Sequence, residues 1–214
     1  MKHSTIVANT PDFDATPFLP LLQSTALLIA ADGGGDALFK VGQVPHLIVG
    51  DLDSITPAAL AALIRGGSEV RRFRTDKDET DLELALLAAV ERGATHIDIL
   101  GALGGRWDQT LSNVALLALP ELHDCHVRLL DRGQEAFLVH GYANISGTVG
   151  DTVSLIPLGG SALGITTRGL HYPLTDATLR FEHSRGVSNV IDSLPAEVTL
   201  RAGMLLIVRQ GANL

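Results

Sequence analysis

Apolar residues in the first part of the chain alternate between short continuous runs and longer stretches with helical spacing. The short runs predict buried strands at residues 5–8, 26–31, 46–50, 70–73, 96–100 and 127–130. The longer stretches predict helices at residues 14–24, 35–41, 57–65, 80–92 and 106–119. Strands that alternate with helices in this way are typical of a mostly parallel sheet with helices on both faces.

The helix expected at residues 80–92 has the clearest boundaries. Thr80 and Glu83 form a capping-box pattern at its start, and Gly93 follows its end. One face is apolar and is formed by Leu82, Ala85, Leu86, Ala89 and Val90. The helix expected at residues 106–119 has a similar face, and Pro120 ends it.

The pattern changes after about Gln134, where helical spacing gives way to short strand-like stretches separated by turn residues. These stretches are residues 135–140, 142–146, 152–157, 162–167, 177–182, 197–201 and 204–209. Their spacing is typical of an all-β sandwich or barrel. We therefore expect an α/β domain at residues 1–132 and an all-β domain at residues 133–214.

Charge and composition narrow the possible functions. The net charge of -8 argues against a nucleic-acid-binding protein, which needs clustered Lys and Arg. The single cysteine, Cys125, excludes an internal disulfide and suits a reducing compartment. No apolar run reaches the ~20 residues that span a bilayer, and the first residues do not form a signal peptide. We expect a cytoplasmic protein that binds neither membranes nor nucleic acid.

Five acidic or glycine-rich clusters follow these predicted strands or precede the predicted helices. They are residues 31–36, 50–54, 76–81, 101–105 and 106–108. Asp32 and Asp51 each follow a strand, so both are expected at the carboxyl edge of the sheet, where ligands bind. Carboxylates at such an edge suit magnesium, and bare backbone lets phosphates come close. Gly33, Gly34 and Gly35 would allow either a turn with positive φ or a close approach to an anion.

Each cluster also has a purely structural interpretation. Asp51 and Asp53 could share one cation, or they could belong to a turn before a helix capped by Ser54 or Thr56. Acidic residues at 76–81 could simply complement a helix dipole, although Lys77 among carboxylates suits a site for polyphosphate. The glycines at 101–105 precede Arg106, which would be a natural phosphate clamp. His123, Cys125 and His126 could suggest zinc, but without a second half of a site they are expected to be structural.

These clusters resemble the blocks of the thiamin pyrophosphokinase family, in the same order and at similar spacing. The matching segments are Ala31-Asp32-Gly33-Gly34, Gly50-Asp51-Leu52-Asp53-Ser54, Asp78-Glu79-Thr80-Asp81 and Gly104-Gly105-Arg106-Trp107-Asp108. The resemblance continues into the second half, at residues 166–172 and at Ser188-Asn189. It therefore covers nearly the whole chain.

The resemblance implies an α/β domain that binds ATP and magnesium, followed by a β-sandwich that binds thiamine and forms a homodimer. It implies transfer of the diphosphate of ATP to the hydroxyl of thiamine, which gives thiamine diphosphate and AMP. The residues that it implies are Asp32, Asp51, Asp53 and Asp81 for magnesium; Asp51, Asp53, Asp81 and Asp108 for catalysis; Gly33, Gly34, Ser54, Lys77, Asp78, Thr80 and Arg106 for ATP; and Asp108, Thr167, Tyr172, Ser188 and Asn189 for thiamine. Tyr172 replaces a tryptophan of some members, and Gln109 stands where many members have histidine.

Two other function classes compete with this one. Residues 47–54 also resemble the nucleophile loop of haloacid-dehalogenase-type phosphatases, in which the aspartate at the position of Asp51 is phosphorylated. Such enzymes usually place that loop on their first strand, whereas two predicted strands precede it here. The third class is a non-catalytic sensor that binds nucleotide or thiamine, because the same folds can bind without reacting.

Overall fold

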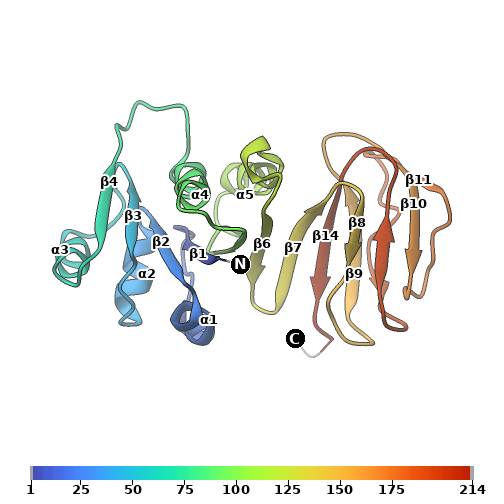
Figure 1. Ribbon diagram of the computed structural model, residues 1–214, viewed down its shortest axis with the longest axis horizontal. Coiled ribbons are helices and arrows are strands. Elements are labelled where there is room, and N and C mark those ends of the chain that lie inside the picture. The colour runs from blue at the N-terminus through green and yellow to red at the C-terminus, as the bar shows by residue number, and fades with distance from the viewer. Residues whose placement is uncertain (1, 213–214) are drawn as a thin grey trace. The chain divides into compact units, whose positions relative to one another are not determined.

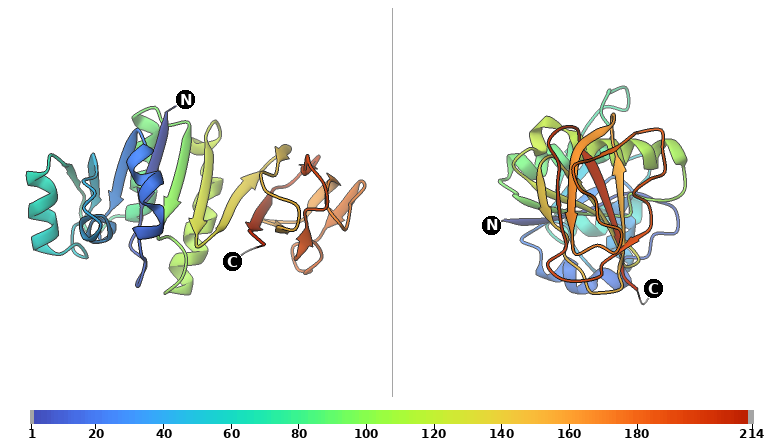
Figure 2. Two further views of the ribbon diagram at one scale, coloured as in Figure 1. Left: turned by 90° about the horizontal axis from the view of Figure 1, so that it is seen from below. Right: turned by 90° about the vertical axis from the view of Figure 1, so that its right-hand side faces the viewer.

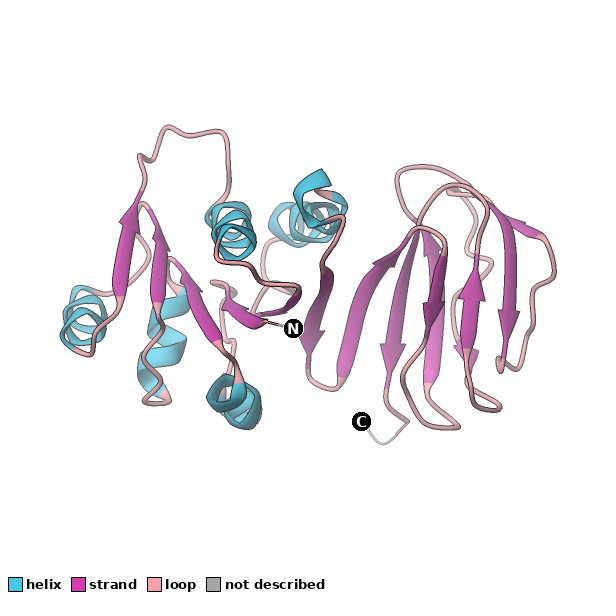
Figure 3. Ribbon diagram, in the orientation of Figure 1, coloured by secondary structure: helices cyan, strands magenta, loops and turns pink. Residues whose placement is uncertain are grey.

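The computed structural model describes residues 2–212. The chain divides into two compact units, Met1–Asp131 and Arg132–Leu214 (Figure 1). The first unit contains strands and helices, and the second is β-rich (Figure 3). The predicted combination of a helix-covered sheet with a separate β-rich region is therefore present. No helix within residues 2–212 has the length and apolar character needed to cross a membrane.

The strands of the first unit form a parallel sheet. In spatial order they are β6 (His126–Asp131), β5 (His96–Leu100), β1 (His3–Val7), β2 (Leu27–Ala31), β3 (Leu47–Gly50) and β4 (Glu69–Arg72). Every neighbouring pair in this order is parallel. All residues of β2 and β3 are buried, which explains why the sequence shows them as continuous apolar runs.

Helices cover both faces of this sheet, as predicted (Figure 1). On one face α1 (Leu19–Ser24), α2 (Gly34–Lys40) and α3 (Pro57–Arg65) contribute Leu22, Leu38 and Leu63 to one apolar core. On the other face α4 (Asp81–Glu91) packs against β1, β2 and β3 through its predicted apolar residues. On the same face as α4 lies α5 (Trp107–Ala115), which follows β5 in the chain.

Two predicted helices are shorter than expected. The stretch 14–24 forms a 3₁₀ turn, Thr16–Phe18, before α1 begins at Leu19, and each segment has a proline in its first turn. The stretch 106–119 is α-helical only to Ala115 and then tightens into the 3₁₀ turn Leu116–Ala118. A further 3₁₀ turn, Pro120–Leu122, follows. Proline lacks a backbone N–H, which explains the break before α1.

The second unit consists of two antiparallel sheets, seen from further directions in Figure 2. One has the order β12 (Asn189–Val190), β9 (Thr152–Pro157), β14 (Leu205–Gln210), β7 (Gln134–Val139). The other has the order β11 (Ala177–Leu179), β10 (Ala162–Arg168), β13 (Glu197–Thr199), β8 (Tyr142–Asn144). Phe137 and Leu155 from the first sheet share one core with Ile165 and Val198 from the second. This core is that of a β-sandwich.

A buried ionic network fixes the end of β14 in this sandwich. Arg209 pairs with Glu135 at 2.9 Å and with Asp151 at 3.0 Å. Burial alone would raise the pKa of Asp151, but hydrogen bonds from Thr148, Ala212 and Arg209 outweigh it and hold the pKa at about 2. The Asp151 carboxylate therefore stabilises the sandwich in its charged form.

Candidate active site

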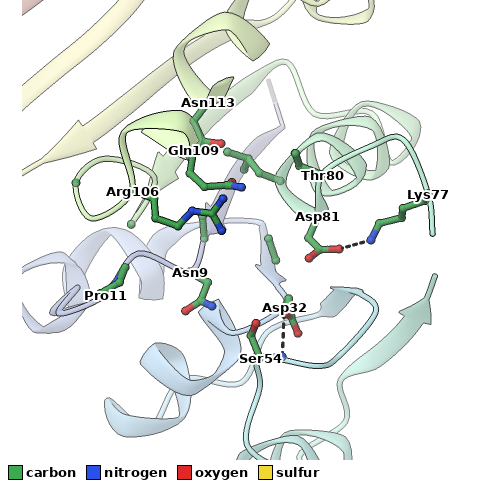
Figure 4. Close-up of a pocket in the computed structure, with 15 residues that line it drawn as sticks. Asn9, Pro11, Asp32, Ser54, Lys77, Thr80, Asp81, Arg106, Gln109 and Asn113 are labelled. Atoms are coloured by element: carbon green, nitrogen blue, oxygen red, sulfur yellow. Dashed lines mark hydrogen bonds and ion pairs between the residues drawn. The ribbon is translucent and has the colours of Figure 1, made fainter. Parts of the chain in front are cut away.

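A cleft of about 410 Å³ opens at the carboxyl ends of the central strands of the first unit (Figure 4). Ala8 and Asn9 follow β1, Asp32 follows β2, and Gly101 and Gly104 follow β5; all five line the cleft. The chain builds the sheet outward from β1 in both directions, so the strand order reverses there. Ligands of open α/β sheets bind at such a reversal, at the carboxyl ends of the strands.

Three carboxylates gather at this edge of the sheet. One oxygen from each of Asp32, Asp51 and Asp53 lies within 4.8 Å of the others. Asp32 is only 4% exposed; its Oδ2 accepts a hydrogen bond from the Ser54 N–H at 3.1 Å, while its Oδ1 has no hydrogen-bond partner. Burial raises the pKa of Asp32, and the nearby Asp81 and Asp51 raise it further against the hydrogen bonds from Ser54. A buried carboxylate oxygen without a donor is costly, and a hard divalent cation would satisfy it.

Each of the same two loops contains a residue with a strained backbone. Asp32 has φ of +42° and Leu52 has φ of +68°, a region that residues with a side chain rarely adopt. Strain of this kind persists where the surrounding structure holds it, and it is common at functional sites. The Leu52 conformation bends the chain so that Asp51 and Asp53 contribute to one acidic group.

The glycines after Asp32 do not form the expected turn with positive φ. Gly33 has φ of -60°, and Gly34 and Gly35 form the first turn of α2. A Cβ on Gly34 would lie 2.0 Å from the Val7 carbonyl oxygen. That part of the prediction is wrong: the strained residue is Asp32, and the absence of side chains lets α2 begin directly against β1.

Gly50, the last residue of β3, lies between two of the carboxylates. A Cβ there would be 3.0 Å from the Asp32 Cβ and 3.1 Å from the Asp81 Cγ, and its φ is +149°. Asp81 is the first residue of α4, whose N-cap Thr80 accepts a hydrogen bond from the Glu83 N–H at 3.2 Å. The capped helix and the bare backbone of Gly50 together bring Asp81 close to Asp32.

Lys77 inserts its ammonium among these acids. Its Nζ lies 3.0 Å from Asp81 Oδ1 and 4.0 Å from Asp51 Oδ2, and its side chain is only 13% exposed. Burial lowers the pKa of Lys77, but the carboxylates of Asp81 and Asp51 outweigh burial and leave the pKa raised. The amine is therefore protonated and places a positive charge at the edge of the cleft.

Arg106 and Asp108 form a pair of their own. The Arg106 guanidinium donates to Asp108 from Nε at 3.1 Å and from a terminal nitrogen at 2.5 Å. This pairing lowers the pKa of Asp108. Arg106 lines the cleft and Asp108 does not, and Asp108 is outside the acidic group of Asp32, Asp51 and Asp53. The catalytic role implied for Asp108 stays a prediction.

The other residues predicted for ATP have different positions. Ser54, Lys77 and Thr80 line the cleft, and the Ser54 hydroxyl donates to Asp53 at 2.9 Å. Asp78 is exposed in the loop before α4. Sequence reasoning missed two amides in the lining, Asn9 and Asn113, and left Gln109 without a role. For Asn9, the only sequence signal is a polar residue directly after the apolar run of β1.

Within the second unit, the residues implied for thiamine form two classes. Thr167 and Asn189 are buried, and their side chains bond to loop backbone: Thr167 Oγ1 accepts from the Leu174 N–H at 2.9 Å. Tyr172 is 64% exposed, and its ring stands edge-on to His171. Ser188 is exposed and has φ of +60°. The buried pair shapes the loops, while the exposed pair is available to a ligand.

Comparison with known proteins identifies the family. Residues 18–129 match the model described as thiamin pyrophosphokinase, catalytic domain, and residues 143–205 match thiamin pyrophosphokinase, vitamin B1 binding domain. The chain belongs to the thiamin pyrophosphokinase family. It is therefore an enzyme, and the carboxylates of the cleft, Asp32, Asp51, Asp53 and Asp81, belong to the segment that matches the catalytic domain.

Named relatives match this chain over most of their own length. The chain is 28% identical to thiamine pyrophosphokinase of Bacillus subtilis, across 98% of this chain and 99% of the relative. It is 27% identical to thiamine pyrophosphokinase 2 of Oryza sativa subsp. japonica, across 95% and 85%. The crystal structure of the Bacillus subtilis protein matches at 27% identity with a TM-score of 0.86, covering 98% of this chain and 99% of that one.

Proposed function

We propose that the enzyme transfers the diphosphate group of ATP to the hydroxyl of thiamine, giving thiamine diphosphate and AMP, in a magnesium-dependent reaction. The observation that carries the proposal is the unpartnered oxygen of buried Asp32 beside Asp51 and Asp53, at the edge of the cleft. Membership in the thiamin pyrophosphokinase family supports the acceptor. The same membership supports ATP as the donor, and the acidic group supports a divalent metal.

The donor set suits magnesium, which prefers carboxylate oxygens and phosphate oxygens. Asp32, Asp51, Asp53 and Asp81 would hold the ion, and the bound ion would neutralise charge on the triphosphate. Lys77 and Arg106 would balance the remaining phosphate charge. Ser54, Asp78, Thr80 and the backbone of Gly33 and Gly34 would complete the ATP site in the first unit.

The chemical step is an in-line displacement at the β-phosphorus. The thiamine oxygen forms a bond to this phosphorus while the bond to the oxygen bridging the α- and β-phosphorus breaks, and AMP leaves with that oxygen. The hydroxyl proton is lost to water or to a neighbouring carboxylate, and Asp108 would orient the hydroxyl. Because such transfers need little covalent help, positioning and charge neutralisation supply most of the acceleration.

Thiamine would bind through the second unit. Tyr172 would offer an aromatic face to the cationic thiazolium, where cation–π attraction is worth ~0.5–2 kcal/mol. Ser188 would contact the ligand, and Thr167 and Asn189 would hold the loops around it. We further propose that the enzyme is a cytoplasmic homodimer whose thiamine pocket forms at the subunit interface, with no membrane or nucleic-acid partner.

The proposal is tested by incubating the protein with Mg-ATP and thiamine and measuring products. AMP and thiamine diphosphate in equal amounts are expected. ADP instead of AMP would show stepwise transfer of single phosphates and would contradict the proposal. A phosphorylated Asp51 with rapid ester hydrolysis would favour the phosphatase class. Binding of both ligands without AMP would favour a sensor.

A further inference from the structure

We propose that Lys77 acts as an internal counter-ion that a divalent cation displaces, so that the released ammonium then binds the triphosphate. Lys77 would thus have two positions, one in the metal-free site and one on the substrate. The inference rests on the metal and ATP sites proposed above. It adds an exchange of cations to that function and a role in ordering the binding steps.

The contacts of Lys77 with the carboxylates support this inference. Its Nζ is 3.0 Å from Asp81 Oδ1 and 4.0 Å from Asp51 Oδ2, so it bridges the start of α4 and the end of β3. Asp51 belongs to the acidic group, and Asp81 approaches Asp32 across Gly50. With a 13% exposed side chain, the ammonium lies within the cluster rather than in solvent.

Two other basic side chains near the cleft, Arg74 and Arg106, have partners of their own. Arg74 donates to Asp76 at 2.7 and 2.6 Å, and Arg106 is held by Asp108. Several carboxylates at this spacing repel one another, and that repulsion must be offset in the absence of metal. Lys77 supplies one positive charge, whereas the buried Asp32 Oδ1 still has no donor. The cluster therefore remains incompletely neutralised and retains affinity for a divalent ion.

A divalent ion and the ammonium cannot share these oxygens without strong repulsion, since both are positive and only a few ångströms would separate them. Lys77 is the side chain that can move. It lies in the loop between Arg72, where β4 ends, and Asp81, where α4 begins. Its four-carbon stem lets the charge move while both elements stay in place. The γ- and β-phosphate oxygens that arrive with the metal would give it a new partner.

This exchange predicts opposite effects of Lys77 on two ligands. In the nucleotide-free enzyme it competes with the metal, so its removal tightens metal binding. In the presence of ATP it is an attractive contact, so its removal weakens nucleotide binding. A lysine that only bound phosphate would affect ATP alone, and a lysine that only stabilised the loop would weaken both.

The test is a titration of nucleotide-free protein with Mn²⁺. Electron paramagnetic resonance measures the concentration of free Mn²⁺ at each step. Lys77→Met should bind Mn²⁺ about tenfold more tightly than the wild type. Lys77→Arg, which keeps the charge, should bind Mn²⁺ like the wild type. Lys40→Met removes an exposed lysine in the last turn of α2 and should change nothing. The KM for ATP of Lys77→Met should rise at least about tenfold.

Unchanged or weaker Mn²⁺ binding by Lys77→Met overturns the exchange, while the proposed function survives if binding still depends on Asp53. Absence of Mn²⁺ binding in every variant overturns both the exchange and the metal site. Thermal melting gives a second measurement. Lys77→Met should melt below the wild type without metal, and saturating Mn²⁺ should remove the difference. A difference that persists with Mn²⁺ indicates a purely structural lysine and contradicts the proposal.

Discussion

The side-chain amide of Asn189 holds the backbone of Tyr172 from both sides. Asn189 Nδ2 donates to the Tyr172 carbonyl at 2.8 Å, and Asn189 Oδ1 accepts from the Tyr172 N–H at 2.9 Å. The same Oδ1 accepts from the Val190 N–H. Asn189 is buried, so these bonds are shielded from water. Asn189, which the family resemblance implies for thiamine binding, therefore also positions the backbone that carries the Tyr172 ring.

Separate replacement of Asn189 and Tyr172 distinguishes positioning of the loop from contact with thiamine. Asn189→Ala leaves buried backbone groups unpaired and should lower the free energy of unfolding by about 2 kcal/mol, while raising the KM for thiamine. Tyr172→Ala should raise the KM for thiamine with little change in stability, because its ring is exposed. Urea unfolding and steady-state kinetics measure both. Equal stability of Asn189→Ala and the wild type would show that the amide does not hold the loop.

Removal of one charged oxygen from the acidic group should stop the reaction without unfolding the protein. Asp53→Asn or Asp81→Asn should lower kcat by about 100-fold or more, since each would remove electrostatic stabilisation at the reacting phosphates. Circular dichroism should be unchanged because neither side chain belongs to an apolar core. Near-normal turnover of both variants at saturating magnesium would mean that the metal assignment is wrong.

Gly50 tests whether close approach of Asp32 and Asp81 matters. Gly50→Ala would place a Cβ 3.0 Å from the Asp32 Cβ and should lower kcat at least about tenfold as the carboxylates separate. Gly67→Ala is the matched control, because Gly67 also has a positive φ of +104° but open space around it. Both variants should lose stability through backbone strain, and only Gly50→Ala should lose activity. Equal activities would contradict the argument from spacing.

Asp151 gives the sandwich a defined sensitivity to acid. Its pKa in the folded protein is about 2, below the value of 3.8 for an unperturbed carboxyl. Because this pKa is lowered, the charged carboxylate adds about 2 kcal/mol to the free energy of unfolding above about pH 4. This contribution is lost as the pH falls toward 2. The free energies of unfolding of the wild type and of Asp151→Asn should therefore differ most near neutral pH. A difference independent of pH between 6 and 2 would exclude this carboxylate as the cause.

Most elements of the sheet were predictable because their signals are local. The continuous apolar runs of β2 and β3 follow from burial on both faces, and the capping box at Thr80 follows from unpaired N–H groups at a helix start. The β-rich character of the second half likewise follows from alternating burial, as in β9. The two-residue strand β12 has no periodicity to detect, because it exists only through its pairing with Val153 and Thr152.

The site was only partly predictable. Strand-end positions and the family resemblance placed Asp32, Asp51 and Asp53 together, but long-range contacts determine which of their oxygens lack donors. The pairing of Arg106 with Asp108 and the insertion of Lys77 depend on side-chain conformation, which no motif encodes. The role of the glycines after Asp32 also depends on a contact distant in sequence. Their small size allows α2 to pack against β1.

The central position of β1 has a consequence for synthesis of the chain. His3–Val7 pairs on one side with β2 and on the other with β5, where His3 lies opposite His96. During translation about a hundred residues must therefore be synthesised before β5, the second neighbour of β1, is available for pairing. Until then one edge of β1 has no partner, and a ribosome-bound chain halted before Leu100 would expose that edge of a hydrophobic strand to chaperones.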